Sequence, residues 1–75
     1  MDLVGLWIEE RCERDPRSEM PTAALHLDYK RWAETHVGFV MSTIAFGREL
    51  SGRGFEPKKV GGSKGFRGLK LQPVT

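Results

Sequence analysis

The chain of 75 residues contains a single cysteine, Cys12, and no long run of hydrophobic residues. One cysteine cannot form an internal disulfide, and we expect it to be a small buried hydrophobic residue in a reducing cytoplasm. Apolar runs of only a few residues are too short to cross a bilayer. The first residues also lack the basic start and apolar stretch of a signal peptide. The sequence therefore predicts a cytoplasmic protein without a membrane anchor.

Groups that bind metals or carry out catalysis are also scarce. Cys12, His26 and His36 are the only cysteine and histidine residues, and their spacing does not match a zinc site. Both histidines are expected on helices, facing solvent. The glycine-rich residues 61–65 lack the G-x-x-x-x-G-K-S/T spacing of a phosphate-binding loop. We expect no catalytic residue, no metal and no cofactor.

Length and charge point to one domain with a basic part. Seventy-five residues allow a single domain, which we place at 1–75. Residues 1–47 carry five basic and eight acidic side chains, a net charge of −3, whereas residues 48–75 carry seven basic and two acidic, a net charge of +5. Such a basic segment is expected to face a polyanion such as DNA. The alternative is a lysine-rich hairpin whose charges only keep the protein soluble.

The first half of the chain predicts two helices. Apolar residues at helical spacing indicate a first helix over 2–13, which Pro16 ends because the residue before a proline avoids the helical conformation. Residues 17–20 are expected to be extended. Thr22 is expected to cap a second helix that runs to about residue 35. The buried stripe of the second helix is predicted to be Leu25, Tyr29, Trp32 and Ala33.

A third helix is predicted over 43–53, with Ser42 as its cap. Its buried residues are expected to be Phe46 and Leu50, and its exposed residues Thr43, Arg48, Glu49 and Arg53. If Gly54 adopts a left-handed conformation, Phe55 can contact Leu50, which is the contact of a Schellman stop.

The last third predicts a β-hairpin, with strands at 55–60 and 66–71 joined by the turn residues 61–65. In the second strand, Leu69 should share one face with Arg67, and Phe66 should share the other face with Lys70. The fold class is therefore α+β. The order of elements predicts a winged helix-turn-helix, with three helices and a C-terminal hairpin wing. In that architecture the later helix enters the major groove and the hairpin lies along the DNA backbone.

The expected DNA-binding residues lie on the third helix and the hairpin. The start of the helix offers free backbone N–H groups and hydroxyls that suit a phosphate, and basic side chains surround the hairpin. The predicted DNA-binding residues are Ser42, Thr43, Arg48, Arg53, Lys58, Lys59, Lys64 and Arg67. Among these and their neighbours, Thr43, Arg48 or Glu49 would touch base edges. Phe66 would pack either against the base of the hairpin or against a sugar of the DNA, and packing in the protein is the preferred interpretation.

Two runs in this region, Ala45-Phe46-Gly47-Arg48 through Arg53-Gly54-Phe55 and then Gly65-Phe66-Arg67-Gly68, carry a resemblance to a known family. The chain resembles, from about Leu6 to Leu71, the C-terminal domain of phage and plasmid primase–helicases. That family is related to the poxvirus primase–helicase and is often described as phage-associated DNA primase.

The resemblance implies a winged-helix DNA-binding module that follows a superfamily 3 helicase ATPase and, further upstream, a primase region. Because neither catalytic part is present, the chain would be an excised, non-catalytic domain. It would anchor the replication enzyme of a mobile element on DNA, most simply on duplex DNA, with the upstream domains of the parent chain as partners. The alternative is a winged helix that docks onto another replication protein. An enzyme is the third hypothesis, which the missing catalytic groups disfavour.

Overall fold

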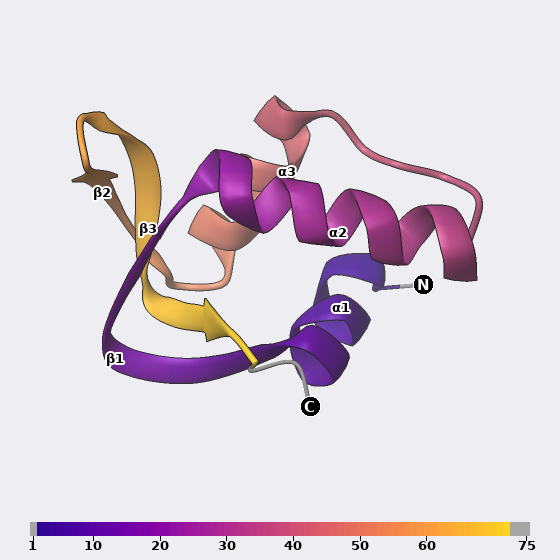
Figure 1. Cartoon of the computed structure of the whole chain (residues 1–75), viewed down its shortest axis with the longest axis horizontal. Helices are drawn as coiled ribbons and strands as arrows, with labels where there is room; N and C mark the ends of the chain where they lie inside the picture. The colour runs from indigo at the N-terminus through magenta and orange to yellow at the C-terminus, as the bar shows by residue number, and fades with distance from the viewer. Residues whose placement is uncertain (1, 73–75) are drawn as a thin grey trace.

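The protein is described here from a computed structural model, in which residues 2–72 are placed. Along this range the elements are α1 (Leu3–Arg11), β1 (Cys12–Pro21), α2 (Thr22–His36), α3 (Thr43–Gly52), β2 (Glu56–Val60) and β3 (Ser63–Leu71). The strands form an antiparallel sheet in the order β1-β3-β2. Figure 1 shows the β2–β3 hairpin extending to one side of the helices. The α+β class predicted from the sequence is confirmed.

The first strand is much longer than the sequence indicated. Helix α1 ends at Arg11, and Cys12 is already extended, with φ −122° and ψ 161°. The prediction of a helix to residue 13 is therefore wrong. The reason is sheet pairing, since the segment from Cys12 to Asp15 lies opposite the end of β3. The apolar spacing that suggested a helical Cys12 also suits a buried strand residue.

The junction between β1 and α2 also differs from the prediction. Pro21 pairs with Gly65 in the sheet and is at the same time the N-cap residue of α2, which has no side-chain capping bond. Thr22 is thus the first helical residue, and its predicted capping role is wrong. The buried stripe of α2 is confirmed as Leu25, Tyr29, Trp32 and Ala33.

Helix α3 begins and ends as its sequence signals predict. The Ser42 hydroxyl accepts the Ala45 N–H at 3.2 Å. At the other end Gly54 has φ +91°, and the Phe55 N–H donates to the Leu50 carbonyl at 3.3 Å. Together with a bond from the Gly54 N–H to the helix, this is the Schellman pattern. The helix itself is one residue shorter than predicted.

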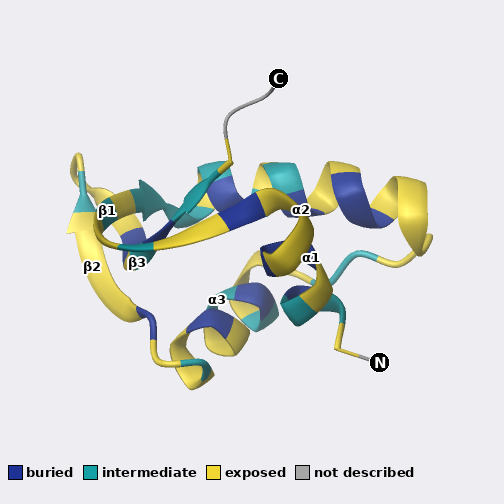
Figure 2. Ribbon diagram, turned by 90° about the horizontal axis from the view of Figure 1, so that it is seen from below, coloured by how far each residue is buried: buried dark blue, intermediate teal, exposed yellow. Residues whose placement is uncertain are grey.

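Three aromatic residues, one from each helix, form the centre of the core. Trp7, Tyr29 and Phe46 are fully buried. The ring centroids of Trp7 and Phe46 are 5.3 Å apart in an edge arrangement, and those of Tyr29 and Phe46 are stacked at 4.9 Å. Such pairs contribute beyond simple burial. Figure 2 shows buried residues on all three helices, whereas β2 is almost entirely exposed.

The hairpin is tighter than predicted. The turn consists of Gly61 and Gly62, both at positive φ, as a two-residue type I′ turn requires. Strand β3 therefore begins at Ser63 instead of at 66. The pairing of β3 with β1 shifts register between Asp15 and Glu19 of β1, opposite Gly68, which has φ +106°.

The backbone conformation of Gly68 changes which side chains of β3 reach the core. Because a residue at φ +106° departs from the extended conformation, the alternation of faces along β3 is interrupted, and both Phe66 and Leu69 are buried. The predicted assignment of these two residues to opposite faces is therefore wrong. The expectation that Phe66 packs in the protein is confirmed.

Candidate nucleic-acid interface

A groove of about 670 Å³ lies between the outer face of α3 and the β2–β3 hairpin. Its rim carries four basic side chains, which are Arg48, Lys58, Lys59 and Lys64. Its apolar lining includes Ile44, Gly47, Pro57 and Phe66. The lining of the groove therefore combines positive charge with apolar surface.

Helix α3 positions its half of the groove through its 3.6-residue period. Phe46 and Leu50 are buried in the core, so the positions on the opposite face are exposed to the groove. Thr43, Gly47 and Ser51 follow one another on this face at intervals of four residues. The helix thus presents a surface of small residues.

The hairpin places two lysines side by side. In the register of β2 and β3, Lys59 lies directly opposite Lys64. Like charges at directly opposed positions destabilise a sheet unless something neutralises them. Neither lysine forms an ion pair with any part of the chain between residues 2 and 72. The pair therefore suits an external anion.

The other two basic residues of the rim differ in whether they already form an ion pair. Lys58 forms an ion pair with Glu19 of β1 and retains 44% exposure of its side chain. Arg48 is exposed and makes no ion pair within the described range. A ligand with several negative charges would therefore meet three free cations and one that exchanges partners.

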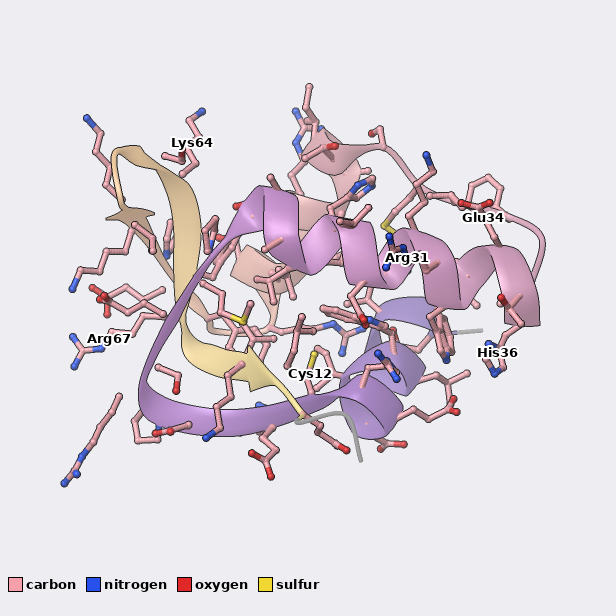
Figure 3. The ribbon with its side chains drawn as sticks, viewed as in Figure 1. Cys12, Arg31, Glu34, His36, Lys64 and Arg67 are labelled. Carbon is pink, nitrogen blue, oxygen red and sulfur yellow. The ribbon has the colours of Figure 1, made fainter. Side chains whose placement is uncertain are left out.

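The groove brings together five of the eight predicted DNA-binding residues, which are Thr43, Arg48, Lys58, Lys59 and Lys64. Ser42 adjoins it as the cap of α3, where its oxygen accepts the Ala45 N–H. Figure 3 shows Lys64 near the tip of the hairpin, with Arg67 further along the sheet toward β1.

Arg67 and Arg53 are not part of the groove. The Arg67 Nε donates to the Pro16 carbonyl at 3.0 Å, although its side chain stays exposed. Arg53 forms an ion pair with Asp2, and its side chain is only 25% exposed. The prediction that Arg53 lies on the exposed face of the helix is wrong, because the last turn of α3 directs it toward the start of α1.

Sequence reasoning missed Ile44 as a residue of this surface. It is 73% exposed, which is the highest value among the large hydrophobic side chains of the described residues. The helical period already indicated its position, since Ile44 follows Thr43 and precedes Arg48 by one turn. Its apolar character kept it out of a search for charged and hydrogen-bonding groups.

The cysteine and the two histidines considered for metal binding lie apart from one another, in different surroundings. His26 is partly buried, with Nε2 3.0 Å from the Met41 carbonyl and its ring beside Phe46, so its predicted exposure is wrong. His36 is exposed as predicted. Burial raises the pKa of the Cys12 thiol to about 12, with the Asp28 charge acting in the same direction. Within residues 2–72 no three histidine, cysteine or carboxylate side chains gather as metal ligands would.

Two further findings bear on function. No helix within the described part of the chain has the length and apolar character needed to cross a membrane. No protein family, curated protein or solved structure matches this chain significantly.

Proposed function

We propose that the chain is a winged-helix domain whose α3 and β2–β3 hairpin bind duplex DNA. The observation that carries the proposal is the groove in which Thr43 and four basic side chains come together from two elements. Arg48, Lys58, Lys59 and Lys64 would neutralise phosphates, and the start of α3 would lie at the base edges. Binding and placement, without catalysis, are the proposed contribution of the domain.

The order of elements supports this proposal. A helix, a strand, two helices and a hairpin follow one another, and β3 lies between β1 and β2. In a winged helix the second of the two adjacent helices enters the major groove, while the hairpin reaches the DNA backbone. We propose that helix α3 and the β2–β3 hairpin take those two roles here. The proposed parent protein is the primase–helicase of a mobile element, in which this domain would anchor the catalytic domains on DNA.

Salt dependence of binding tests the proposal. If the four rim cations meet phosphates, log Kobs should fall against log salt with a slope of about −3.6, from about −0.9 for each phosphate. A variant in which Lys58, Lys59 and Lys64 are all changed to alanine should bind every duplex more weakly. Its slope should flatten to about −0.9, because only Arg48 remains on the rim. Fluorescence anisotropy with a random-sequence duplex over a salt series measures both quantities.

A second variant distinguishes the effect of charges in the groove from the effect of the overall net charge. Changing Arg17, Lys30 and Arg31 to alanine also removes three positive charges, all from exposed positions outside the groove. We expect this control to keep the slope of the parent within about one unit, the value of a single phosphate contact. Equal losses in the two variants would show that binding follows overall charge alone. Binding that is insensitive to salt would contradict the proposal itself.

A protein partner is the second candidate, and the apolar lining of the groove favours it. The exposed Ile44 and the neighbouring Pro57 could bury against an amphipathic helix of another replication protein. A domain that fails to bind duplex DNA but binds the ATPase region of a primase–helicase would support this function. An Ile44→Asp change should then weaken that association strongly.

A further inference from the structure

Resting on the proposed DNA-binding function, we propose that Ile44 recognises thymine. Its side chain would contact the C5-methyl group of a thymine in the major groove. The surface of α3 would then prefer A·T pairs at that position through an apolar contact. This assignment concerns base preference, to which the phosphate-binding lysines do not contribute.

The position of Ile44 places it where base edges would be met. It is the second residue of α3, and residues at the N-terminal end of a recognition helix contact base edges. Its side chain lines the groove and is 73% exposed. An isoleucine with this exposure contributes little to the core. Its apolar surface is therefore free to be buried against a bound ligand.

The chemistry of the major groove limits what Ile44 can touch favourably. The base edges there carry hydrogen-bond donors and acceptors, and the thymine methyl is the apolar group among them. Packing an isoleucine against a guanine or adenine edge would remove water from polar atoms and give them no partner. Contact with the thymine methyl has no such cost and adds apolar burial.

The small residues beside Ile44 permit a close approach. Gly47 lies one turn further along the same face, and an added Cβ there would meet only the Phe66 ring, at 4.0 Å. Ser51 follows on the next turn and is also small and exposed. The surface beside Ile44 is therefore low enough for a base edge to reach the isoleucine side chain.

Charge complementarity selects DNA as the occupant of this apolar patch. Arg48 on α3 and the Lys59–Lys64 pair on the hairpin lie on the rim around it. A duplex brings phosphates to the rim and base edges to the floor at the same time. An uncharged apolar ligand would leave the opposed lysines without a partner.

Replacing thymine by uracil tests the inference, because it deletes only the methyl group. The probes are two short duplexes of alternating adenine and thymine, one with every thymine replaced by uracil. We expect the full chain to bind the thymine duplex about fourfold more tightly, which is the effect of burying one methyl-sized group. Ile44→Ala should remove this preference and keep the salt slope. Because Ile44 is so exposed, circular dichroism melting of the variant should match the parent.

A second pair of probes and a control variant make the result specific. Adding the 5-methyl group to cytosine in an alternating G·C duplex places a methyl at the same groove position. It should tighten binding for the parent and not for Ile44→Ala. Leu27→Ala removes another exposed hydrophobic residue, from α2 and outside the groove, and should keep the thymine preference. Loss of the preference in that control would overturn the assignment to Ile44.

The possible failures are distinguishable. Salt-dependent binding with equal affinity for thymine and uracil duplexes would overturn the role of Ile44 and leave the DNA-binding function standing. No binding to any duplex would overturn the proposed function, and the inference with it. If Ile44→Ala then weakened binding to the ATPase region of a primase–helicase, the groove would be assigned to a protein.

Discussion

The indole N–H of Trp7 donates to Oδ2 of Asp28 at 2.9 Å and so ties α1 to α2 beside the aromatic core. Trp7 is completely buried, so its N–H has no access to water. Arg11 adds two bonds to the same carboxylate, at 3.1 and 2.8 Å. A single acidic residue of α2 thus satisfies a buried donor and fixes the last turn of α1.

Replacing Asp28 by alanine should destabilise the domain by about 1–3 kcal/mol, because the buried indole N–H of Trp7 would lose its partner. Asp28→Asn keeps an oxygen that can accept from Trp7 and loses the charge that faces Arg11, so its cost should be smaller. Urea unfolding followed by tryptophan fluorescence measures both. Equal stability of the alanine variant and the parent would show that the Trp7–Asp28 bond contributes nothing.

The same carboxylate predicts a pH dependence. Burial raises the pKa of Asp28, but the hydrogen bonds from Arg11 and Trp7 outweigh burial, and the pKa lies below its ordinary value of 3.8. The stabilisation is therefore complete above pH 3.8 and is lost as pH falls through the lowered pKa. Asp28→Asn should remove this part of the acid destabilisation. The check is the difference in unfolding free energy between parent and variant at pH 6 and at the lowest pH where both still fold.

Two glycines allow a matched test of backbone strain. Gly68 has φ +106°, and an added Cβ would lie 3.3 Å from the Phe55 ring. Gly52 ends α3 with open space around it. Gly68→Ala should therefore destabilise by about 1–3 kcal/mol, whereas Gly52→Ala should be neutral or stabilise by up to about 1 kcal/mol. Thermal unfolding compares the two, and similar melting temperatures would contradict the role assigned to the backbone conformation of Gly68.

The state of Cys12 can be tested chemically. Its side chain is buried and the pKa of its thiol is raised to about 12, so almost no thiolate exists near neutral pH. Iodoacetamide should therefore react very slowly with the folded protein and rapidly in urea. Mass spectrometry over time measures the two rates. Fast alkylation of the folded protein would show that the junction between α1 and β1 opens readily.

Local signals in the sequence predicted the elements well where one residue determines the backbone. Ser42 and Gly54 mark the two ends of α3, and the structure confirms both roles. The boundary near Cys12 could not be predicted in the same way, because pairing with distant β3 decides it. The conformation of Gly68, with φ +106°, was likewise not predicted, and Phe66 and Leu69 are both buried instead of lying on opposite faces of the last strand.

The candidate site was predictable only in part, because local patterns determine some of its residues and long-range contacts determine others. The helical period placed Thr43 and Arg48 correctly on the outer face of α3. It did not predict that Arg53, at the end of that helix, would turn toward Asp2. That ion pair joins residues 51 positions apart in the sequence, and no periodic pattern encodes such a contact.

The two arginines of this region therefore form a matched pair for a last prediction. Arg48 lies on the rim of the groove, whereas Arg53 lies outside it against Asp2. Arg48→Ala should reduce the size of the salt slope by about 0.9, the value of one phosphate contact. If Arg48 also reaches a guanine edge, the variant should lose preference at one base pair by about 1–3 kcal/mol.

Arg53→Ala should instead leave DNA binding unchanged. Its partner Asp2 is 58% exposed, so loss of the ion pair should have little effect on stability. The two variants have the same net charge, so a difference between their salt slopes can only reflect where the charge was removed. Anisotropy titrations of both against one duplex make the comparison. Equal slopes would show that DNA does not approach the domain through the groove.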